Sequence, residues 1–155
     1  EASEEQSTEA GINFDRFIFT YPGQKTLGKR GGHDMRMTSN VDLREEMRQH
    51  KAEMKYVQEG EIDLGLDVLR IGADTAVLFI GVEINSGTWK KIRENSPFKN
   101  TMIVEFSNLN GGGYLPEKDY YEKVTHQSTK TRYAAGSAER LADDALAALN
   151  KLAGK

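Results

Sequence analysis

The sequence predicts an α/β or α+β domain whose mixed sheet contains a βαβ unit and which ends in a C-terminal amphipathic helix. Two apolar runs, at residues 75–83 and 100–108, are separated by a short helical pattern, which is the order of a parallel strand crossover. Residues 135–154 carry small and apolar side chains at a helical spacing. Their apolar stripe consists of Leu141, Ala145, Leu149 and Leu152.

The composition predicts one soluble acidic domain. The chain has 155 residues, 37% of them hydrophobic, and a net charge of -3 from 21 basic and 24 acidic residues. This balance gives no general attraction to nucleic acid or to anionic membranes. No run approaches the ~20 apolar residues of a membrane helix, so no membrane span is expected. The absence of cysteine excludes disulfides and thiolate chemistry.

The first part of the chain has weaker patterns. Residues 1–12 are small and acidic, which predicts a disordered lead-in or linker to a single domain at residues 13–155. The segment FDRFIFTY, residues 14–21, predicts a strand. Residues 24–40 are Gly-rich and basic without periodicity, and residues 41–57 are charged with a helical spacing of apolar side chains, which predicts a helix.

The periodicity of apolar residues becomes stronger after residue 60. Residues 61–72 alternate apolar side chains with acidic residues and glycine, which predicts a strand with one buried face. The inward positions are Ile62, Leu64, Leu66 and Val68. Residues 75–83 form a continuous apolar run that ends in a carboxylate, as expected of a central strand buried on both faces.

A helix is predicted between the two apolar runs. Ser86 is suited to cap its first turn, Trp89 and Ile92 fall on one face, and Pro97 follows the expected end at Asn95. A helical crossover of this length is right-handed and joins neighbouring strands of one sheet. We therefore expect the two apolar strands to be adjacent and parallel, with the helix packed on one sheet face.

Glu83 and the loop NLNGGGYLP, residues 108–116, are predicted to lie at one sheet edge. Ligands of parallel sheets bind beyond the carboxyl ends of the strands; Glu83 ends one strand, and the loop leaves the next. The glycines permit positive φ angles and a close approach to a neighbour, and Pro116 stiffens the exit. We expect Glu83 and Tyr114 to converge. The alternative is that Glu83 forms a salt bridge at a strand end while Tyr114 covers the core.

Further candidates carry weaker signals. His33 follows two glycines, His50 lies in the predicted charged helix and His126 follows the tyrosine loop. No two histidines have the i, i+4 spacing of a helical metal site, so a surface role competes with a ligand role for each. GQKTLGKR, residues 23–30, places Arg30 where a phosphate-binding loop has its magnesium-binding hydroxyl, and nucleotide binding is not expected.

Several segments, taken in order, resemble one enzyme family. They are LRIG (69–72), the apolar strand ending in Glu83, ENSP (94–97), FSN (106–108), GYLP (113–116), YYE (120–122) and AGSAERLADDAL (135–146). From about Asp63 to Leu152 the chain resembles the later part of the catalytic domain of the neutral and alkaline, non-lysosomal, ceramidases and their bacterial relatives.

The resemblance implies a zinc-dependent amide hydrolase acting on N-acyl sphingoid lipids or related amides. The family holds zinc with two histidines, a glutamate and a tyrosine. Its Pro-Gly-Glu turn corresponds to residues 81–83, which read Gly-Val-Glu here, and its Gly-Tyr-x-Pro motif contains Tyr114. The resemblance thus implies that Glu83 and Tyr114 are metal ligands and catalytic residues. It also suggests a secreted or periplasmic location.

The family's histidines come from earlier motifs that have no counterpart in this chain. The expected partner is therefore an N-terminal portion or a partner chain that carries histidine ligands, and residues 13–155 are expected to be the C-terminal part of a larger catalytic domain. A second function stays open. The chain can instead be a non-catalytic binding or assembly module that keeps the fold without the metal chemistry, in keeping with the missing Pro-Gly and histidines.

Overall fold

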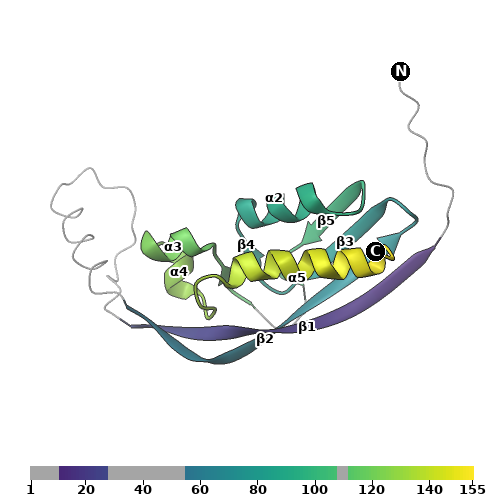
Figure 1. Cartoon of the computed structure of the whole chain (residues 1–155). Coiled ribbons are helices and arrows are strands. Elements are labelled where there is room, and N and C mark those ends of the chain that lie inside the picture. The colour runs from purple at the N-terminus through teal and green to yellow at the C-terminus, as the bar shows by residue number, and fades with distance from the viewer. Residues whose placement is uncertain (1–10, 28–54, 108–111) are drawn as a thin grey trace, which may run out of the picture.

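A computed structural model describes residues 11–27, 55–107 and 112–155 (Figure 1). Its strands are β1 (Ile12–Leu27), β2 (Lys55–Ile71), β3 (Thr75–Ile80), β4 (Glu83–Ile84), β5 (Asn100–Val104) and β6 (Tyr114–Leu115). Its helices are α2 (Ser86–Asn95), α3 (Lys118–Glu122), α4 (His126–Lys130) and α5 (Ser137–Leu152). A mixed sheet with a C-terminal amphipathic helix confirms the predicted fold class.

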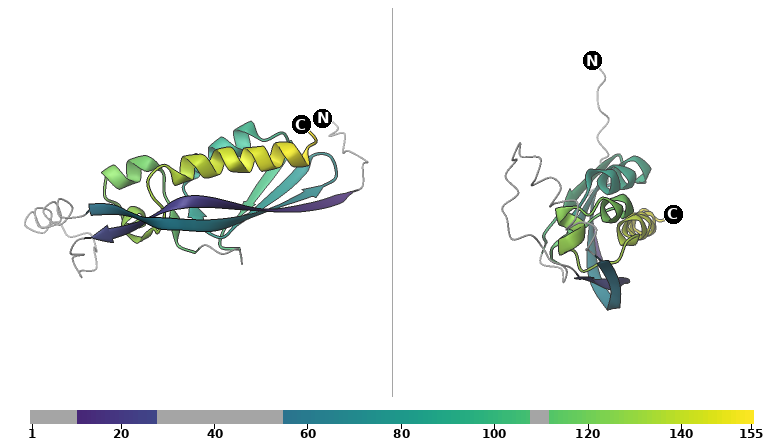
Figure 2. Two further views of the ribbon diagram at one scale, coloured as in Figure 1. Left: turned by 60° about the horizontal axis from the view of Figure 1, so that its bottom comes forward. Right: turned by 90° about the vertical axis from the view of Figure 1, so that its left-hand side faces the viewer.

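The main sheet has the strand order β1-β2-β3-β5, and β4 and β6 form a second, two-stranded sheet. β1 and β2 are a long antiparallel pair that twists along the molecule beside α5 (Figure 2). The predicted strand at residues 14–21 lies within β1, but the strand also includes residues 24–27, where the sequence shows no strand periodicity. Its register shifts between Pro22 and Gln24, where Gly23 of β1 faces two residues of β2, Glu59 and Gly60, and Gly60 has a positive φ, as in a β-bulge.

The charged helix predicted at residues 41–57 is wrong where the structure tests it. Residues 55–57 begin β2 and pair with Leu27, Thr26 and Lys25 of β1, while residues 41–54 lie outside the described part. Tyr56 and Val57 are aromatic and β-branched, so they favour a strand once a partner strand lies beside them. The helical spacing of apolar residues further upstream could not reveal that partner.

The predicted crossover is confirmed. β3 and β5 are adjacent and parallel, with Thr75 opposite Asn100 and Phe79 opposite Val104, and α2 joins them. Ile92 of α2 is buried in the core, and Trp89 packs partly buried against the core.

Three predicted boundaries at this crossover are wrong, and one of them is the end of the second strand, since β5 ends at Val104 and does not include residues 105–107. β3 ends at Ile80, and Glu83 lies in the separate strand β4, because the chain turns at Gly81 and Val82 and buries the Val82 side chain in the core. The N-cap residue of α2 is Asn85, whose side chain makes no capping hydrogen bond, and Ser86 is the first helical residue.

The core lies between one sheet face and the helices α2 and α5, which cover that face (Figure 1). The alternation predicted for β2 is confirmed: Leu64, Leu66 and Val68 are fully buried and share the core with the stripe of α5. Asp67 points to the opposite face, as predicted for an acidic residue of this strand, yet only 6% of it is exposed. Arg16 on β1 covers Asp67, since its guanidinium donates to both carboxylate oxygens.

Buried tyrosines make this core sensitive to alkaline pH. Tyr21 is fully buried and donates its hydroxyl to Asp144 of α5 at 2.7 Å. Burial, and then the hydrogen bond to Asp144, raise the pKa of Tyr21, and burial also raises the pKa values of Tyr121 and Tyr133. The folded state therefore keeps protons that the unfolded state releases above about pH 10.

We predict that the free energy of unfolding is unaffected by these tyrosines below about pH 9 and falls as the pH rises through about 10 and above. Urea titrations at pH 8, 9.5 and 10.5 measure this loss. Tyr21→Phe should lower stability at pH 8, because Asp144 loses a donor, and should flatten the loss at higher pH. If the free energy of unfolding of this variant fell with pH as steeply as that of the parent, the loss at alkaline pH could not be assigned to Tyr21.

Candidate functional site

Glu83 and Tyr114 lie directly opposite each other. They pair in the parallel register of β4 and β6, where Ile84 pairs with Leu115. The Glu83 N–H donates to the Gly113 carbonyl at 2.9 Å, which holds the two strands together. Neighbouring strands lie about 4.8 Å apart, and paired residues project to the same side. The predicted convergence of Glu83 and Tyr114 is therefore confirmed as a matter of position.

The two strands are fixed to the core by the residues that follow the pair. Ile84 and Leu115 are buried members of the core cluster and face away from the side on which Glu83 and Tyr114 project. Tyr114 is further held by Thr131, whose hydroxyl donates to the Tyr114 carbonyl at 2.6 Å. Both candidate residues thus stand on a rigid base while remaining partly exposed.

The glycines before Tyr114 have the expected backbone conformation. Gly112 and Gly113 both have φ of 77°, in the left-handed region that glycine adopts without strain. The expected close approach to a neighbour is confirmed for the backbone, since the Gly112 N–H donates to the Gly81 carbonyl at 2.6 Å, although an added Cβ at either glycine would meet no atom within 4 Å. Their backbone conformation, and not a lack of space, requires glycine. Residues 108–111 lie outside the described part.

We predict that Gly112→Ala and Gly113→Ala each lower the free energy of unfolding by about 1 kcal/mol, because alanine is strained at positive φ. Gly11→Ala is the matched control, since a Cβ there also meets open space and the residue does not have a positive φ. Chemical denaturation of the three variants checks the prediction. Equal stability of Gly113→Ala and Gly11→Ala would contradict it.

Glu105 is a third side chain at this edge, and the sequence analysis missed it. It follows the end of β5 and accepts a hydrogen bond from the Ile84 N–H at 3.3 Å. Burial raises the pKa of Glu105, the negative charge of Glu83 raises it further, and the hydrogen bond from Ile84 opposes both effects. The predicted strand at residues 100–108 placed Glu105 inside the strand, and only the end of β5 at Val104 leaves it at this edge.

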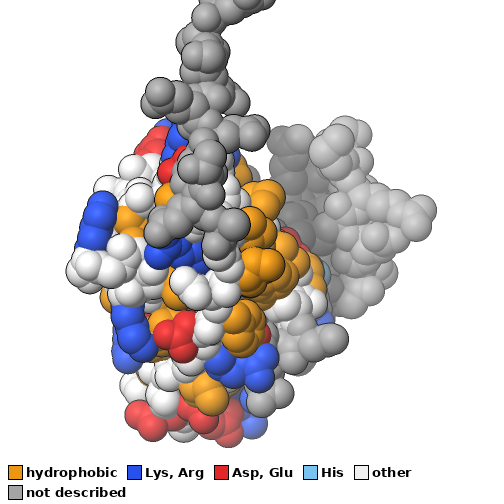
Figure 3. All heavy atoms as spheres, turned by 90° about the vertical axis from the view of Figure 1, so that its right-hand side faces the viewer, with side chains coloured by type: hydrophobic (Ala, Val, Ile, Leu, Met, Phe, Trp, Pro, Cys, Tyr) orange, Lys and Arg blue, Asp and Glu red, His pale blue; other side chains and the backbone are white. Residues whose placement is uncertain are grey.

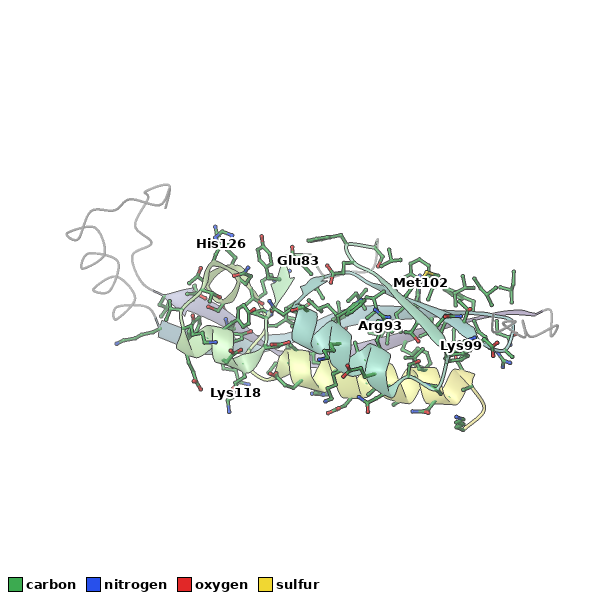
Figure 4. All side chains as sticks on the ribbon, turned by 90° about the horizontal axis from the view of Figure 1, so that it is seen from above. Glu83, Arg93, Lys99, Met102, Lys118 and His126 are labelled. Carbon is green, nitrogen blue, oxygen red and sulfur yellow. The ribbon has the colours of Figure 1, made fainter. Side chains whose placement is uncertain are left out.

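His126 also lies near the pair. It begins α4, and its ring makes an edge contact with the Tyr114 ring at a centroid distance of 5.6 Å. Glu83, His126 and Met102 of β5 lie along the edge of the molecule opposite α5 (Figure 4). The other candidate histidines, His33 and His50, lie outside the described residues.

The donor atoms at this edge suit a hard metal ion but do not enclose one. Glutamate and tyrosinate oxygens are both acceptable zinc ligands, and Glu83 and Tyr114 stand side by side. Within residues 11–27, 55–107 and 112–155, no three or more histidine, aspartate or glutamate side chains form a group that could hold a metal ion. Two oxygen ligands alone hold zinc weakly, so a tight site requires ligands from elsewhere.

In the described ranges, no helix has the length and apolar character needed to cross a membrane. No family model matches the chain, and no curated protein and no solved structure is similar to it.

Proposed function

We propose that the protein is a zinc-dependent amide hydrolase of the neutral ceramidase type, acting on N-acyl sphingoid lipids or related amides. In this proposal Glu83 and Tyr114 bind the metal, and an N-terminal portion or a partner chain supplies histidine ligands. The observation that carries the proposal is the register of β4 and β6, which puts a carboxylate and a phenol on neighbouring backbones at one exposed edge.

The chemistry follows from these donor types. A bound zinc ion would supply an activated water, whose pKa it lowers to about 7. Glu83 contributes negative charge that retains the metal. The Tyr114 oxygen would hold the metal as a phenolate; only a protonated Tyr114 that is not bound to the metal has the O–H needed to stabilise negative charge on the amide oxygen during attack. Glu105 holds β4 through the Ile84 N–H and so positions Glu83.

The experiment compares two forms of the protein. The 155 residues alone are expected to hydrolyse no N-acyl sphingoid substrate and to bind zinc only loosely, because the histidine ligands are missing. The longest natural polypeptide that contains these residues, with any chain that co-purifies, is expected to hydrolyse it. Efficient turnover by the 155 residues alone would contradict the need for outside ligands and would turn attention to His33 and His126.

A second candidate is a non-catalytic binding or assembly module. The specific observation in its favour is a set of large exposed apolar side chains on the sheet face opposite the helices, including Phe14, Ile18 and Met102. Such a face is typical of a protein contact. Metal content discriminates the two candidates, since stoichiometric zinc favours the hydrolase and its absence from the longest natural form favours the module.

A further inference from the structure

The free edge of β5 carries backbone groups that no described strand uses. β5 is the last strand of the main sheet, and within the described ranges no strand pairs with its other side. The Asn100 N–H donates to the Asp74 carbonyl at 2.9 Å, so the backbone groups of Asn100 point toward β3. Since successive residues of a strand direct these groups to opposite sides, those of Thr101 and Ile103 point away from the sheet. β5 therefore offers two N–H donors and two carbonyl acceptors along its free edge.

This edge lacks three features that protect exposed strands from pairing. Proline, charged side chains and bulges block the addition of a strand, and Asn100–Val104 has none of them. Met102 and Val104 are 52% and 40% exposed, and Figure 3 shows hydrophobic side chains gathered along one face of the molecule. An open groove of about 760 Å³ follows β5 and is lined on its helical side by Trp89 and Arg93 of α2. The edge therefore has room for another strand.

The two ends of β5 carry opposite charges. Lys99 directly precedes the strand, and Glu105 directly follows it. In the part of the chain that the structure describes, neither side chain belongs to an ion pair. Met102 lies midway between them in the sequence, so a two-fold rotation about Met102 exchanges the positions of the cation and the anion. Antiparallel pairing with a second β5 would therefore oppose each Lys99 to a Glu105.

Only one antiparallel register of two β5 strands uses all of these free backbone groups. With Met102 opposite Met102, Thr101 of each copy lies opposite Ile103 of the other, and both pairs exchange two hydrogen bonds. A register with Thr101 opposite Thr101, or with Ile103 opposite Ile103, leaves one such pair inside the strands. It also moves Lys99 away from Glu105. Backbone pairing and charge pairing therefore select the same register.

We propose that the protein forms a two-fold dimer through the free edge of β5, in which the two four-stranded sheets join into one of eight strands. The partner is a second copy of this chain, and the same surface is used by both copies, with Met102 on the axis. Main-chain hydrogen bonds to an exposed sheet edge are an established mode of association. Opposite charges in directly opposed cross-strand pairs stabilise the pairing, and like charges weaken it. The proposal does not depend on zinc binding.

Single cysteines test the register, because the chain has none of its own. Met102 would oppose its own copy as a pair without backbone hydrogen bonds, whose Cα atoms lie about 4.5 Å apart, within the range of a disulfide. Val104→Cys is the matched control: Val104 is exposed on the same strand, but its own copy would lie about 13 Å away along the strand. Both variants of the full 155-residue chain are treated with a mild thiol oxidant at equal protein concentration. We expect Met102→Cys to form a disulfide dimer at least 100-fold faster than Val104→Cys.

Reversal of one charge tests the pairing of the strand ends. Lys99→Glu puts two like-charged pairs into the interface, so we expect the dissociation constant of the dimer, measured by sedimentation over a range of concentrations, to rise at least 10-fold. Lys118→Glu is the control, because it makes the same charge change at an exposed position of α3, toward the opposite end of the molecule from Lys99 (Figure 4). It should leave the dissociation constant unchanged.

Four results would overturn the proposal. Sedimentation as a monomer at every protein concentration would show that no dimer forms. Equal oxidation rates of Met102→Cys and Val104→Cys would show that their thiols meet only by random collision. A dimer whose dissociation constant is unchanged by Lys99→Glu would have its interface elsewhere. A monomer whose β5 amides gain protection from hydrogen exchange only when a different polypeptide is added would assign the edge to that polypeptide.

Discussion

Tyr114→Phe is expected to lower kcat by about 10²–10³-fold in the longest natural form, the scale of losing one group that stabilises developing charge. The substitution deletes only the hydroxyl oxygen. The Tyr114 ring keeps its contact with His126, and its carbonyl keeps the hydrogen bond from Thr131, because neither involves that oxygen. The free energy of unfolding is therefore expected to stay within about 0.5 kcal/mol of the parent.

Single-turnover kinetics and urea denaturation of the same preparation measure the two quantities. Tyr120→Phe is the matched control, since Tyr120 is a partly exposed tyrosine of α3, six residues further along the chain. It should leave kcat unchanged. Full activity of Tyr114→Phe would mean that the tyrosine covers the core edge and has no part in catalysis, the alternative that spacing alone left open.

Leu115→Ala, unlike Tyr114→Phe, is expected to affect stability strongly, with a loss of about 2–5 kcal/mol in the free energy of unfolding. Leu115 is fully buried, pairs with Ile84 across β4 and β6, and belongs to the core cluster. Truncation leaves a cavity beneath the two strands that carry Glu83 and Tyr114. Thermal and urea denaturation measure the cost. A loss below about 1 kcal/mol would show that β6 does not depend on the core for its position.

The two variants together separate placement from chemistry. Residual zinc retention in Leu115→Ala, measured under conditions in which the variant is still folded, should fall because the base of both oxygen ligands loosens. Tyr114→Phe should affect the reaction rate far more than the fold. If both variants changed only the free energy of unfolding, the edge formed by β4 and β6 would stabilise the fold and have no part in metal binding or catalysis.

The crossover and the helix α5 were predictable because their signals are local and strong. A continuous apolar run is buried whatever its neighbours are, and a stripe of Leu141, Ala145 and Leu149 fits only a helix lying on a core. The meeting of Glu83 and Tyr114 was predictable from the same crossover, since adjacent parallel strands end at one edge.

Other features depend on partners that are distant in the sequence. The pairing of β1 with β2 makes strand of residues 24–27 and 55–57. No local periodicity of the sequence predicts that pairing. The alternating pattern of β2 predicted that Asp67 faces solvent, yet Arg16, which is 51 residues away in the sequence, covers it. The contact of Glu105 with the Ile84 N–H depends on the break between β3 and β4 and on the end of β5 at Val104, and neither was predicted.

Zinc stoichiometry of the longest natural form tests the central claim most directly. Metal analysis after extensive dialysis is expected to give one zinc ion per chain for the parent. Glu83→Gln should lose most of this metal, because it removes a charge from the ligand set, whereas Glu94→Gln, at an exposed position of α2, should keep it. Absence of zinc from the parent, or full retention by Glu83→Gln, would contradict the assignment of Glu83 and Tyr114 to a metal site.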